Sequence, residues 1–359
     1  MTVFENALAV ALGKETGQIP VVLQVYSLVL KRFARVKEYD YYQDIKLQLE
    51  AKVTFQKRFP SVLNIGLGVV PEYAEFVGPI PTAFGGKVRW MEDSPPYVGE
   101  YPIKEPNDID KLVEAGLPEA NAGIASQVLE RLEYFYDWFP KDLREEYGMV
   151  DGVVVPGGCV ESAALSMGYD KFFIWMRQYP DVIHKWLKLS TDWLIKYCEA
   201  IEAVVGSCKV LWIADHIPSM VGKQQFKEFV LPYFNKIFGK YRGALRIWHN
   251  EGYVGYMLEE VDKIDSEVWH FGPKEDIVEC RNKTHFCLQG NIHPPDFAKM
   301  TPKEVESRCE EIVFKSGGNK LWLSTGGGVS PDTPLRNIDA MVKTAERLSR
   351  KLSDNSPLI

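Results

Sequence analysis

The chain has 359 residues, of which 46% are hydrophobic and 12% aromatic, so it can bury the large core of a globular protein. Its formal net charge of −7 disfavours nucleic acid and anionic membranes as partners, because both attract basic surfaces. The six cysteines are scattered and form no CxxC pair, which indicates reduced thiols in a cytoplasmic protein rather than a disulfide framework or a cysteine-rich zinc site.

The first fifteen residues, MTVFENALAVALGKE, are apolar but carry Glu5 and have no basic leading segment. We therefore predict a short helix here and no signal peptide. No stretch of the sequence is long and apolar enough to predict a membrane span.

Short apolar runs rich in β-branched residues predict eight strands. They lie at 19–26, 62–70, 152–158, 209–216, 244–250, 267–273, 285–292 and 320–328. From the third run onward most are separated by amphipathic segments, such as 223–241 and 301–318, which predict helices. Eight such units predict an α/β fold, a (β/α)8 TIM barrel that spans residues 1–359 as one domain.

The stretch from about 71 to 150 does not fit a simple strand-helix unit. It contains GPIPTAFGGKVRWMED and PPYVGEYPIKEPNDIDKL, followed by the helical pattern EANAGIASQVLERLEYFYDWF. We predict an inserted hairpin and extra helices over one barrel end in the N-terminal part of the chain.

The barrel prediction sorts the candidate site residues, because active sites of this fold are built from strand ends and the loops that follow them. The stretch RIWHNEG (246–252) places His249 and Glu251 at such an end. A histidine alone is more often structural, but this pairing favours function. The other strand-end candidates are Gln24, Tyr26, Cys159, Glu161, Asp215, His216, His270, Asn291, His293 and the turn 324–328.

Several stretches, in order and spacing, resemble the uroporphyrinogen decarboxylase superfamily, which includes corrinoid-dependent methyltransferases. They are IPVV (19–22), FKEFVLPYFNKI (226–237), IWHNEG (247–252), CLQGNIHPPDF (287–297) and LSTGGGVSPDTPLRNIDAMV (323–342). The resemblance covers most of the chain and is weaker before residue 150. It implies the barrel fold but does not fix the reaction.

Two branches of the superfamily fit poorly. The decarboxylase branch resembles sequences with a paired-arginine motif after the first strand, whereas this chain reads QVYSLVLKRF (24–33) there. Without convergent arginines a pocket is poorly equipped for a substrate with many carboxylates. The thiol-methylating branch resembles sequences with two zinc-binding cysteines, and here Glu251 and Gly327 stand at or near those places.

The remaining branch, which demethylates substrates onto a corrinoid protein, resembles sequences with a zinc signature of Glu, fourteen residues, Glu, twenty residues, His. Glu228 and His249 match its second half, and Asp215 is the acidic residue nearest the first position. The resemblance therefore implies a Zn²⁺ site of Asp215, Glu228 and His249, with Glu251 as a further ligand or a proton carrier. It also implies a corrinoid (cobalamin) carried by a partner protein, because the chain shows no cobalamin-binding motif of its own.

The predicted function is thus a zinc-dependent methyltransferase acting on a small methylated donor, an aryl methyl ether in first place. A metal on the leaving atom would act as a Lewis acid, and a nearby acid would supply the proton. The predicted catalytic residues are Asp215, His216 and Glu251. The predicted substrate-binding residues are Tyr26, Trp248, His270, Asn291, His293 and Gly327.

Other functions stay open at this point. One is a metal-free lyase related to the decarboxylases, with Asp215 and His249 as acid and base. Another is transfer of methyl from a methylcorrinoid to a thiol or folate, and a third is a non-catalytic protein that binds a small ligand or a corrinoid protein. The methyl donor and the oligomeric state, a homodimer included, are not fixed by the sequence.

Overall fold

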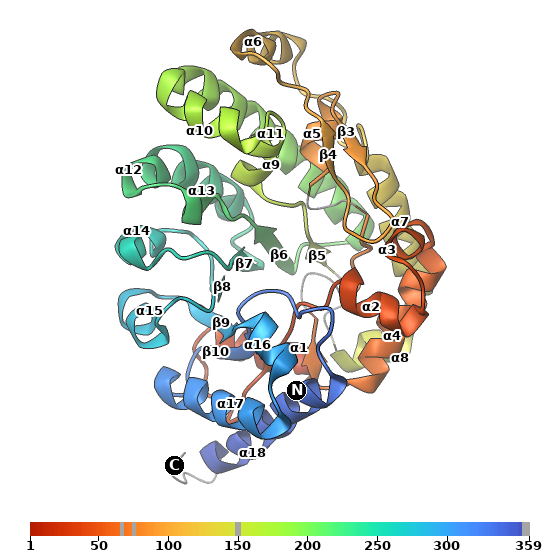
Figure 1. The fold of residues 1–359 in the computed structure, drawn as a ribbon, viewed down its shortest axis with the longest axis vertical. Helices are drawn as coiled ribbons and strands as arrows, with labels where there is room; N and C mark the ends of the chain where they lie inside the picture. Colours follow the sequence, from red (N-terminus) through yellow and green to blue (C-terminus); the bar gives the residue numbers. More distant parts are fainter. Residues whose placement is uncertain (65–67, 74–76, 148–151, 354–359) are drawn as a thin grey trace.

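All eight predicted strands are present in the computed structural model, which describes residues 1–64, 68–73, 77–147 and 152–353. They form one parallel sheet in the order β2-β1-β10-β9-β8-β7-β6-β5, rolled up in the centre of the molecule (Figure 1). The strands are β1 Val21–Val22, β2 Val62–Leu63, β5 Val153–Val154, β6 Val210–Ala214, β7 Leu245–Asn250, β8 Val268–Phe271, β9 Cys287–Ile292 and β10 Leu321–Thr325. The predicted (β/α)8 barrel class is confirmed.

Helices surround these strands on the outside (Figure 1). They are α1 Val3–Ala11, α2 Ser27–Ala34, α3 Glu38–Gln43, α4 Ile45–Arg58, α5 Pro79–Ala83, α6 Pro106–Ala115, α7 Ala125–Trp138, α8 Lys141–Tyr147, α9 Cys159–Leu165, α10 Tyr169–Gln178, α11 Pro180–Val205, α12 Lys223–Gln225, α13 Leu231–Lys240, α14 Leu258–Val261, α15 Ile277–Lys283, α16 Pro294–Lys299, α17 Pro302–Ser316 and α18 Leu335–Ser353. Short 3-10 turns occur at η1 Ile217–Met220 and η3 Gly255–Met257, and a π-helical turn at η2 Phe226–Val230. None of the helices in the described ranges combines the length and apolarity needed to cross a membrane.

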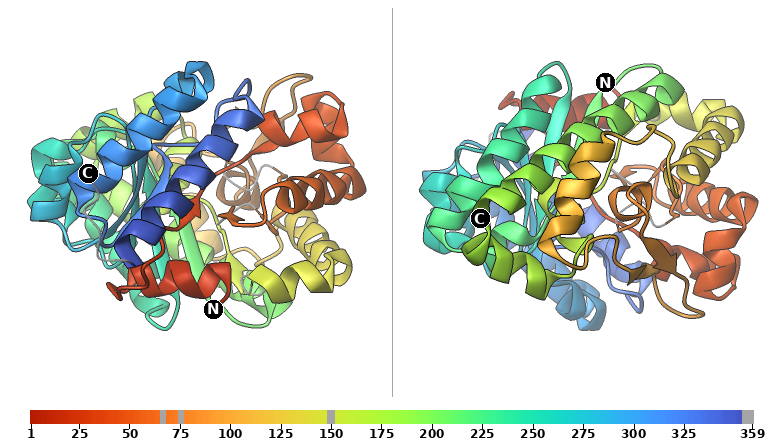
Figure 2. Two further views of the ribbon diagram at one scale, coloured as in Figure 1. Left: turned by 90° about the horizontal axis from the view of Figure 1, so that it is seen from below. Right: turned by 90° about the horizontal axis from the view of Figure 1, so that it is seen from above.

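The predicted insertion is present between β2 and β5. Strands β3 Lys87–Arg89 and β4 Tyr97–Glu100 pair antiparallel as the hairpin, and helices α6, α7 and α8 follow. Helix α6 packs along α11, and the hairpin lies beside α5 (Figures 1 and 2). Residues 74–76 and 148–150 of the predicted insertion lie outside the described part of the chain.

Alternation along each strand decides which side chains face the barrel interior. In β6, Trp212 belongs to the apolar cluster inside the barrel, whereas Leu211 and Ile213 belong to the cluster between the strands and the helices. Helix α1 closes the amino end of the interior, where the Trp322 indole donates a hydrogen bond to the Ala7 carbonyl at 3.0 Å. Helix α1 therefore covers the amino end of the barrel interior, and the cavity described below lies at the carboxyl end.

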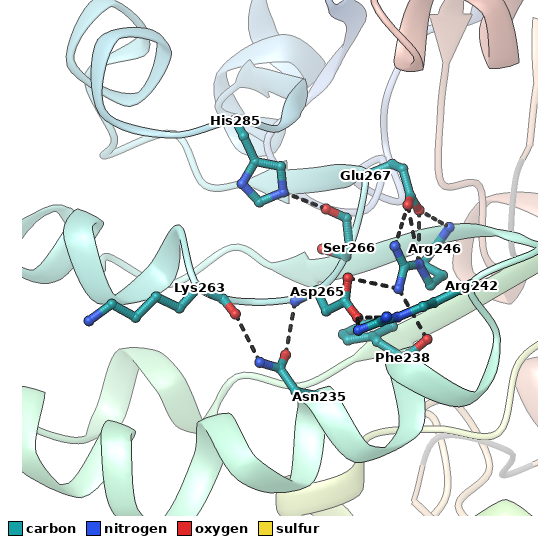
Figure 3. A network of polar contacts seen from close by, with 9 residues as sticks. All are labelled: Asn235, Phe238, Arg242, Arg246, Lys263, Asp265, Ser266, Glu267 and His285. Atoms are coloured by element: carbon teal, nitrogen blue, oxygen red, sulfur yellow. Dashed lines mark hydrogen bonds and ion pairs between the residues drawn. The ribbon is translucent and has the colours of Figure 1, made fainter.

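The amino ends of β7 and β8 are joined by a network of charges (Figure 3). The buried Arg246 guanidinium pairs with Glu267 and, at 2.9 Å, with Asp265, and it donates to the Phe238 carbonyl at 3.1 Å. Arg242 approaches the second oxygen of Asp265 at 3.2 Å. Because these charges are matched, the network fixes the register of the two strands without leaving a buried charge unpaired.

Candidate active site

A cavity of about 790 Å³ lies at the carboxyl ends of the strands. Much of its wall is aromatic, with side chains from Tyr26, Tyr42, Tyr169, Trp212 and Tyr253. Its titratable members are Glu72, Glu161, His216, His249, Glu251, Lys274 and His293. No arginine and no cysteine is among the described residues that line it.

His216 and Glu161 form a tight pair in this wall. The Glu161 carboxylate contacts the His216 Nδ1 at 2.9 Å and also accepts the His216 backbone N–H at 2.9 Å. Burial lowers the pKa of His216, but the hydrogen bond and charge of Glu161 outweigh burial and raise that pKa to about 9. His216 is therefore an imidazolium near neutral pH, and its buried Nε2 has no hydrogen-bond partner among the residues that the structure describes.

Glu161 is itself held in place at the start of α9. The Tyr169 hydroxyl donates to its other oxygen at 2.6 Å. Burial opposes ionisation of Glu161, but the hydrogen bonds from His216 and Tyr169 hold its pKa below the usual value. The chain can enter α9 this close to β6 because residue 158 is glycine, where a Cβ would collide with the Ala214 carbonyl.

Asp215 is buried beside this pair but faces away from the cavity. Its carboxylate accepts the backbone N–H groups of Val160 at 2.8 Å, Glu161 at 2.9 Å and Ile217 at 3.2 Å. Burial and the neighbouring Glu161 raise the pKa of Asp215 to about 7, against the pull of these backbone donors. Asp215 ties the start of α9 to the end of β6 and is absent from the described lining of the cavity, and its roles as catalytic residue and metal ligand remain predictions.

His249 and His270 form a second pair, from the adjacent strands β7 and β8. Their Nδ1 atoms lie 2.9 Å apart, and His270 Nε2 lies 2.9 Å from the Thr325 carbonyl. Burial lowers the pKa of His249 well below its usual value and that of His270 to about 4, so both rings are neutral at pH 7. His249 lines the cavity, whereas the predicted substrate-binding residue His270 stands behind it.

Glu251 lines the cavity one residue beyond the end of β7, as predicted. Burial raises the pKa of its carboxyl. The carboxylate extends to Gly327, whose φ is 135° and where a Cβ would collide with the Glu251 Oε2. Gly327, predicted to bind substrate, instead leaves room for Glu251, and its N–H approaches the His270 Nε2 at 3.2 Å.

Of the six predicted substrate-binding residues, two line the cavity and four, including His270 and Gly327, do not. Tyr26 and His293 are in its wall. Trp248 faces outward, stacked on Trp269 with ring centroids 5.4 Å apart, because it precedes the inward-facing His249 in the strand. Asn291 is buried, and its amide donates to the carbonyls of residues 272 and 275. Neither Trp248 nor Asn291 is in the described lining of the cavity, and their roles in substrate binding remain predictions.

The predicted zinc ligands do not come together. Glu228 lies in the π-helical turn η2 on the outer helical layer, with a 41% exposed side chain, and approaches the His184 Nε2 at 3.6 Å. With Asp215 turned to backbone N–H groups, only His249 of the three faces the cavity. Within the described ranges no three His, Cys, Asp or Glu side chains are grouped to hold a metal ion. These residues do not fit the predicted zinc site.

Sequence reasoning misses part of this site. Glu161 is among the strand-end candidates, but the sequence assigns it no role, and the aromatic walls Trp212 and Tyr169 are not identified at all. Trp212 shares the inward face of β6 with Ala214, but no sequence signal marks that face because every residue of β6 is buried. Tyr169 opens α10 and meets Glu161 only in the fold.

Comparison with known proteins agrees with this architecture. The human uroporphyrinogen decarboxylase is 25% identical over 298 residues, covering 77% of this chain and 76% of the relative. The zebrafish (Danio rerio) enzyme is 24% identical over 295 residues, covering 76% and 74%. A solved methyltransferase from Methanosarcina mazei shares the fold with a TM-score of 0.77, at 19% identity over 97% of this chain and 99% of that one.

The family model of uroporphyrinogen decarboxylase (URO-D) matches residues 2–348. Because the match spans nearly the whole described barrel, the chain belongs to the uroporphyrinogen decarboxylase family.

Proposed function

We propose that the chain is a methyltransferase that takes the methyl group from a small aryl methyl ether and delivers it to the cobalt of a corrinoid on a separate protein. The observation that carries the proposal is His216, an imidazolium whose Nε2 has no partner in an aromatic cavity. Negative charge develops on the ether oxygen as this oxygen leaves the methyl group. A fixed N–H donor beside the oxygen stabilises that charge.

The cavity supports this class of donor. Tyrosine and tryptophan walls fit an aromatic ring. A substrate with many carboxylates needs several cationic side chains that converge on it. The described lining contains two cationic side chains, Lys274 and His216. It also contains three carboxylates, Glu72, Glu161 and Glu251. That balance favours a neutral ligand.

The chain's own residues account for the leaving group. As the methyl–oxygen bond breaks, its electron pair passes to oxygen, and the proton on His216 Nε2 moves to that oxygen to give the phenol. Glu161 holds the imidazole in place through this step and stabilises its charge beforehand. Glu251, with its raised pKa, is a second acid in the wall that could return the proton to His216.

The methyl acceptor must come from outside the cavity, because no cysteine thiolate is available in its described lining. A reduced corrinoid supplies a nucleophilic cobalt that accepts methyl. Zinc has no part in this proposal, since the predicted ligands are not grouped within the described residues.

Decarboxylation is the second candidate, favoured by the curated relatives, which are uroporphyrinogen decarboxylases. His216 and Lys274 could hold one carboxylate, and His216 could protonate the carbon that loses CO₂.

One experiment separates the two. The purified chain is incubated without oxygen with reduced cobalamin and 2-methoxyphenol, and catechol is measured by chromatography while the cobalamin spectrum is followed. In parallel, CO₂ release from an aromatic carboxylate and from uroporphyrinogen is measured. We expect catechol and no CO₂; CO₂ release without any demethylation of a methoxyarene would replace the proposal by the lyase.

A further inference from the structure

Glu275 is a buried acid that the proposed reaction does not use. It lies in the loop between β8 and α15, and only 5% of its surface is exposed. Its carboxylate accepts the Val254 backbone N–H at 2.5 Å, and the Gly255 backbone N–H is its second donor. In the part of the chain that the structure describes, no lysine, arginine or histidine pairs with this carboxylate. Backbone dipoles alone therefore meet its charge, in a place that excludes water.

The backbone of Glu275 is held firmly on one side. The Asn291 amide donates to the Glu275 carbonyl at 3.1 Å and to the Gly272 carbonyl at 3.2 Å. The Glu275 N–H donates to the same Gly272 carbonyl at 3.3 Å. The side chain thus extends from a fixed loop to the segment of residues 252–257 opposite, which we call the Tyr253 segment.

The Tyr253 segment covers both the buried acid and part of the cavity. Tyr253 lines the cavity with a side of the ring in solvent, since the residue is 47% exposed. A Cβ at Gly255 would lie 2.7 Å from the Tyr253 ring and 2.9 Å from the Glu275 Oε2, so the glycine lets both groups meet over the same backbone. The Tyr256 hydroxyl donates to the Val221 carbonyl at 2.6 Å. Movement of this segment would bring water to Glu275 and widen the cavity mouth.

The proton of Glu275 is coupled to this movement. Burial raises the pKa of Glu275 from 4.5 to about 7, with a contribution from Glu279 and against the two backbone donors. Once the segment opens and water reaches the carboxyl, its pKa returns towards 4.5. The closed form therefore binds the proton more tightly, and loss of the proton favours opening. The stabilisation of the closed form is complete below pH 4.5 and is lost as the pH rises through about 7.

No other group near Glu275 explains a transition between pH 6 and 8. The ionisable side chains around it come from the Tyr253 segment, its own loop and α15, and they are Tyr253, Tyr256, Lys274, Asp276, Glu279 and Cys280. Strand β9 contributes the neutral Asn291. Burial raises the pKa of Tyr256 above 10.0 and that of Cys280 above 9.0, so both keep their protons in this range. Glu279 is the neighbour that needs a control.

We propose that Glu275 is a pH-sensitive switch at the cavity mouth, whose neutral form keeps the Tyr253 segment closed and whose ionised form releases it. Release takes Tyr253 out of the cavity wall, so ligands exchange faster above neutral pH. The switch acts on access to the cavity and does not depend on the reaction that takes place inside.

The first test uses the wild-type chain. Hydrogen exchange of peptides that span 252–257 is followed by mass spectrometry at pH 6 and pH 8, and the rates are corrected for the intrinsic effect of pH. With pKa values of 4.5 and about 7, the open-to-closed ratio rises about tenfold between these pH values, so protection should fall about tenfold. Peptides from β9 should show no such change. Protection of 252–257 that is unchanged or higher at pH 8 would overturn the proposal.

The second test separates a switch from a structural carboxylate. Glu275→Gln keeps the shape of the neutral acid and cannot ionise, so protection of 252–257 should no longer depend on pH and should exceed that of wild type at pH 8 at least about tenfold. The control is Glu279→Gln, which removes a half-exposed carboxylate paired with Lys283 and should keep the dependence on pH. If Glu275→Gln lowered the protection at pH 8, the ionised carboxylate would be a structural anchor and the proposal would be wrong.

Discussion

The two ends of strand β7 carry polar residues of opposite character. At the amino end, Arg246 is buried and all its charge is met by Glu267, Asp265 and a backbone carbonyl. At the carboxyl end, His249 and Glu251 face a cavity and leave polar atoms for a ligand. Polar residues in one buried strand therefore serve stability at one end and binding at the other, as barrel geometry requires.

The difference lies in how completely each group is paired. The charges of the Arg246 network are already paired, so a ligand cannot stabilise them further. The Nε2 of His216 is buried without a hydrogen-bond partner among the described residues, which costs desolvation free energy that a hydrogen bond to a ligand would offset. Variants at the two ends should consequently separate activity from stability.

The largest effect is expected at the carboxyl end. His216→Ala removes the proton donor and should lower turnover of methoxyarenes by about 10²- to 10⁴-fold, with smaller losses for donors whose phenols are acidic. Because Glu161 keeps the Tyr169 hydroxyl as a donor, the thermal unfolding midpoint should fall less than for Arg246→Met. The control is His184→Ala, a partly exposed histidine on α11. A loss below about threefold for His216→Ala would show that another group protonates the leaving oxygen.

The amino end should respond in the opposite way. Arg246→Met leaves Glu267 and Asp265 without their buried partner and should lower the free energy of unfolding by about 2–3 kcal/mol, the low end for buried pairs because both carboxylates keep some water. Urea unfolding measures this, and methoxyarene binding should be unchanged. Lys185→Met, which breaks an exposed pair with Asp110, should have a far smaller effect. Equal losses of unfolding free energy from Arg246→Met and Lys185→Met would contradict the stabilising role of the buried Arg246 network.

The charge of His216 can be shifted without removing it. The pKa of about 9 implies that turnover is sustained below that pH and falls as the pH rises through it, because the proton is then lost. Glu161→Gln removes the partner that raises this pKa, so the decline should move towards the ordinary histidine range, and turnover at pH 8 should drop at least about tenfold. An unchanged alkaline limit would mean that a different group titrates.

The smallest effect is expected on the outer helical layer. Glu228→Gln alters a side chain that pairs with His184 outside the cavity, so zinc content and turnover should both stay within about twofold of wild type. The zinc content of Glu228→Gln is measured beside that of His249→Ala and of the wild-type protein. Loss of bound zinc from Glu228→Gln would reinstate the ligand set inferred from spacing.

The sequence predicts the eight strands and the insertion because apolar runs and turns are local signals. It does not predict the inward face of a strand such as ALRIWHN, in which both faces are buried and alternation is hidden, so Trp248 and His249 look equally suited to a site. It also fails for Asp215, because two of its three backbone donors, Val160 and Glu161, lie 55 and 54 residues earlier in the chain. Glu228 matches the zinc signature by spacing alone, and spacing does not determine in which direction a side chain points.

The meeting of Glu251 and Gly327 restricts how this site can evolve. A side chain at 327 collides with the glutamate and is also strained at the φ of 135°, so a cysteine there requires a shorter residue 251 and a shift of the local backbone. A cysteine at 251, by contrast, is sterically compatible with the glycine. The effect of a substitution at 327 therefore depends on the residue at 251. A cavity with cysteines at both positions can be reached from this one only if residue 251 changes first.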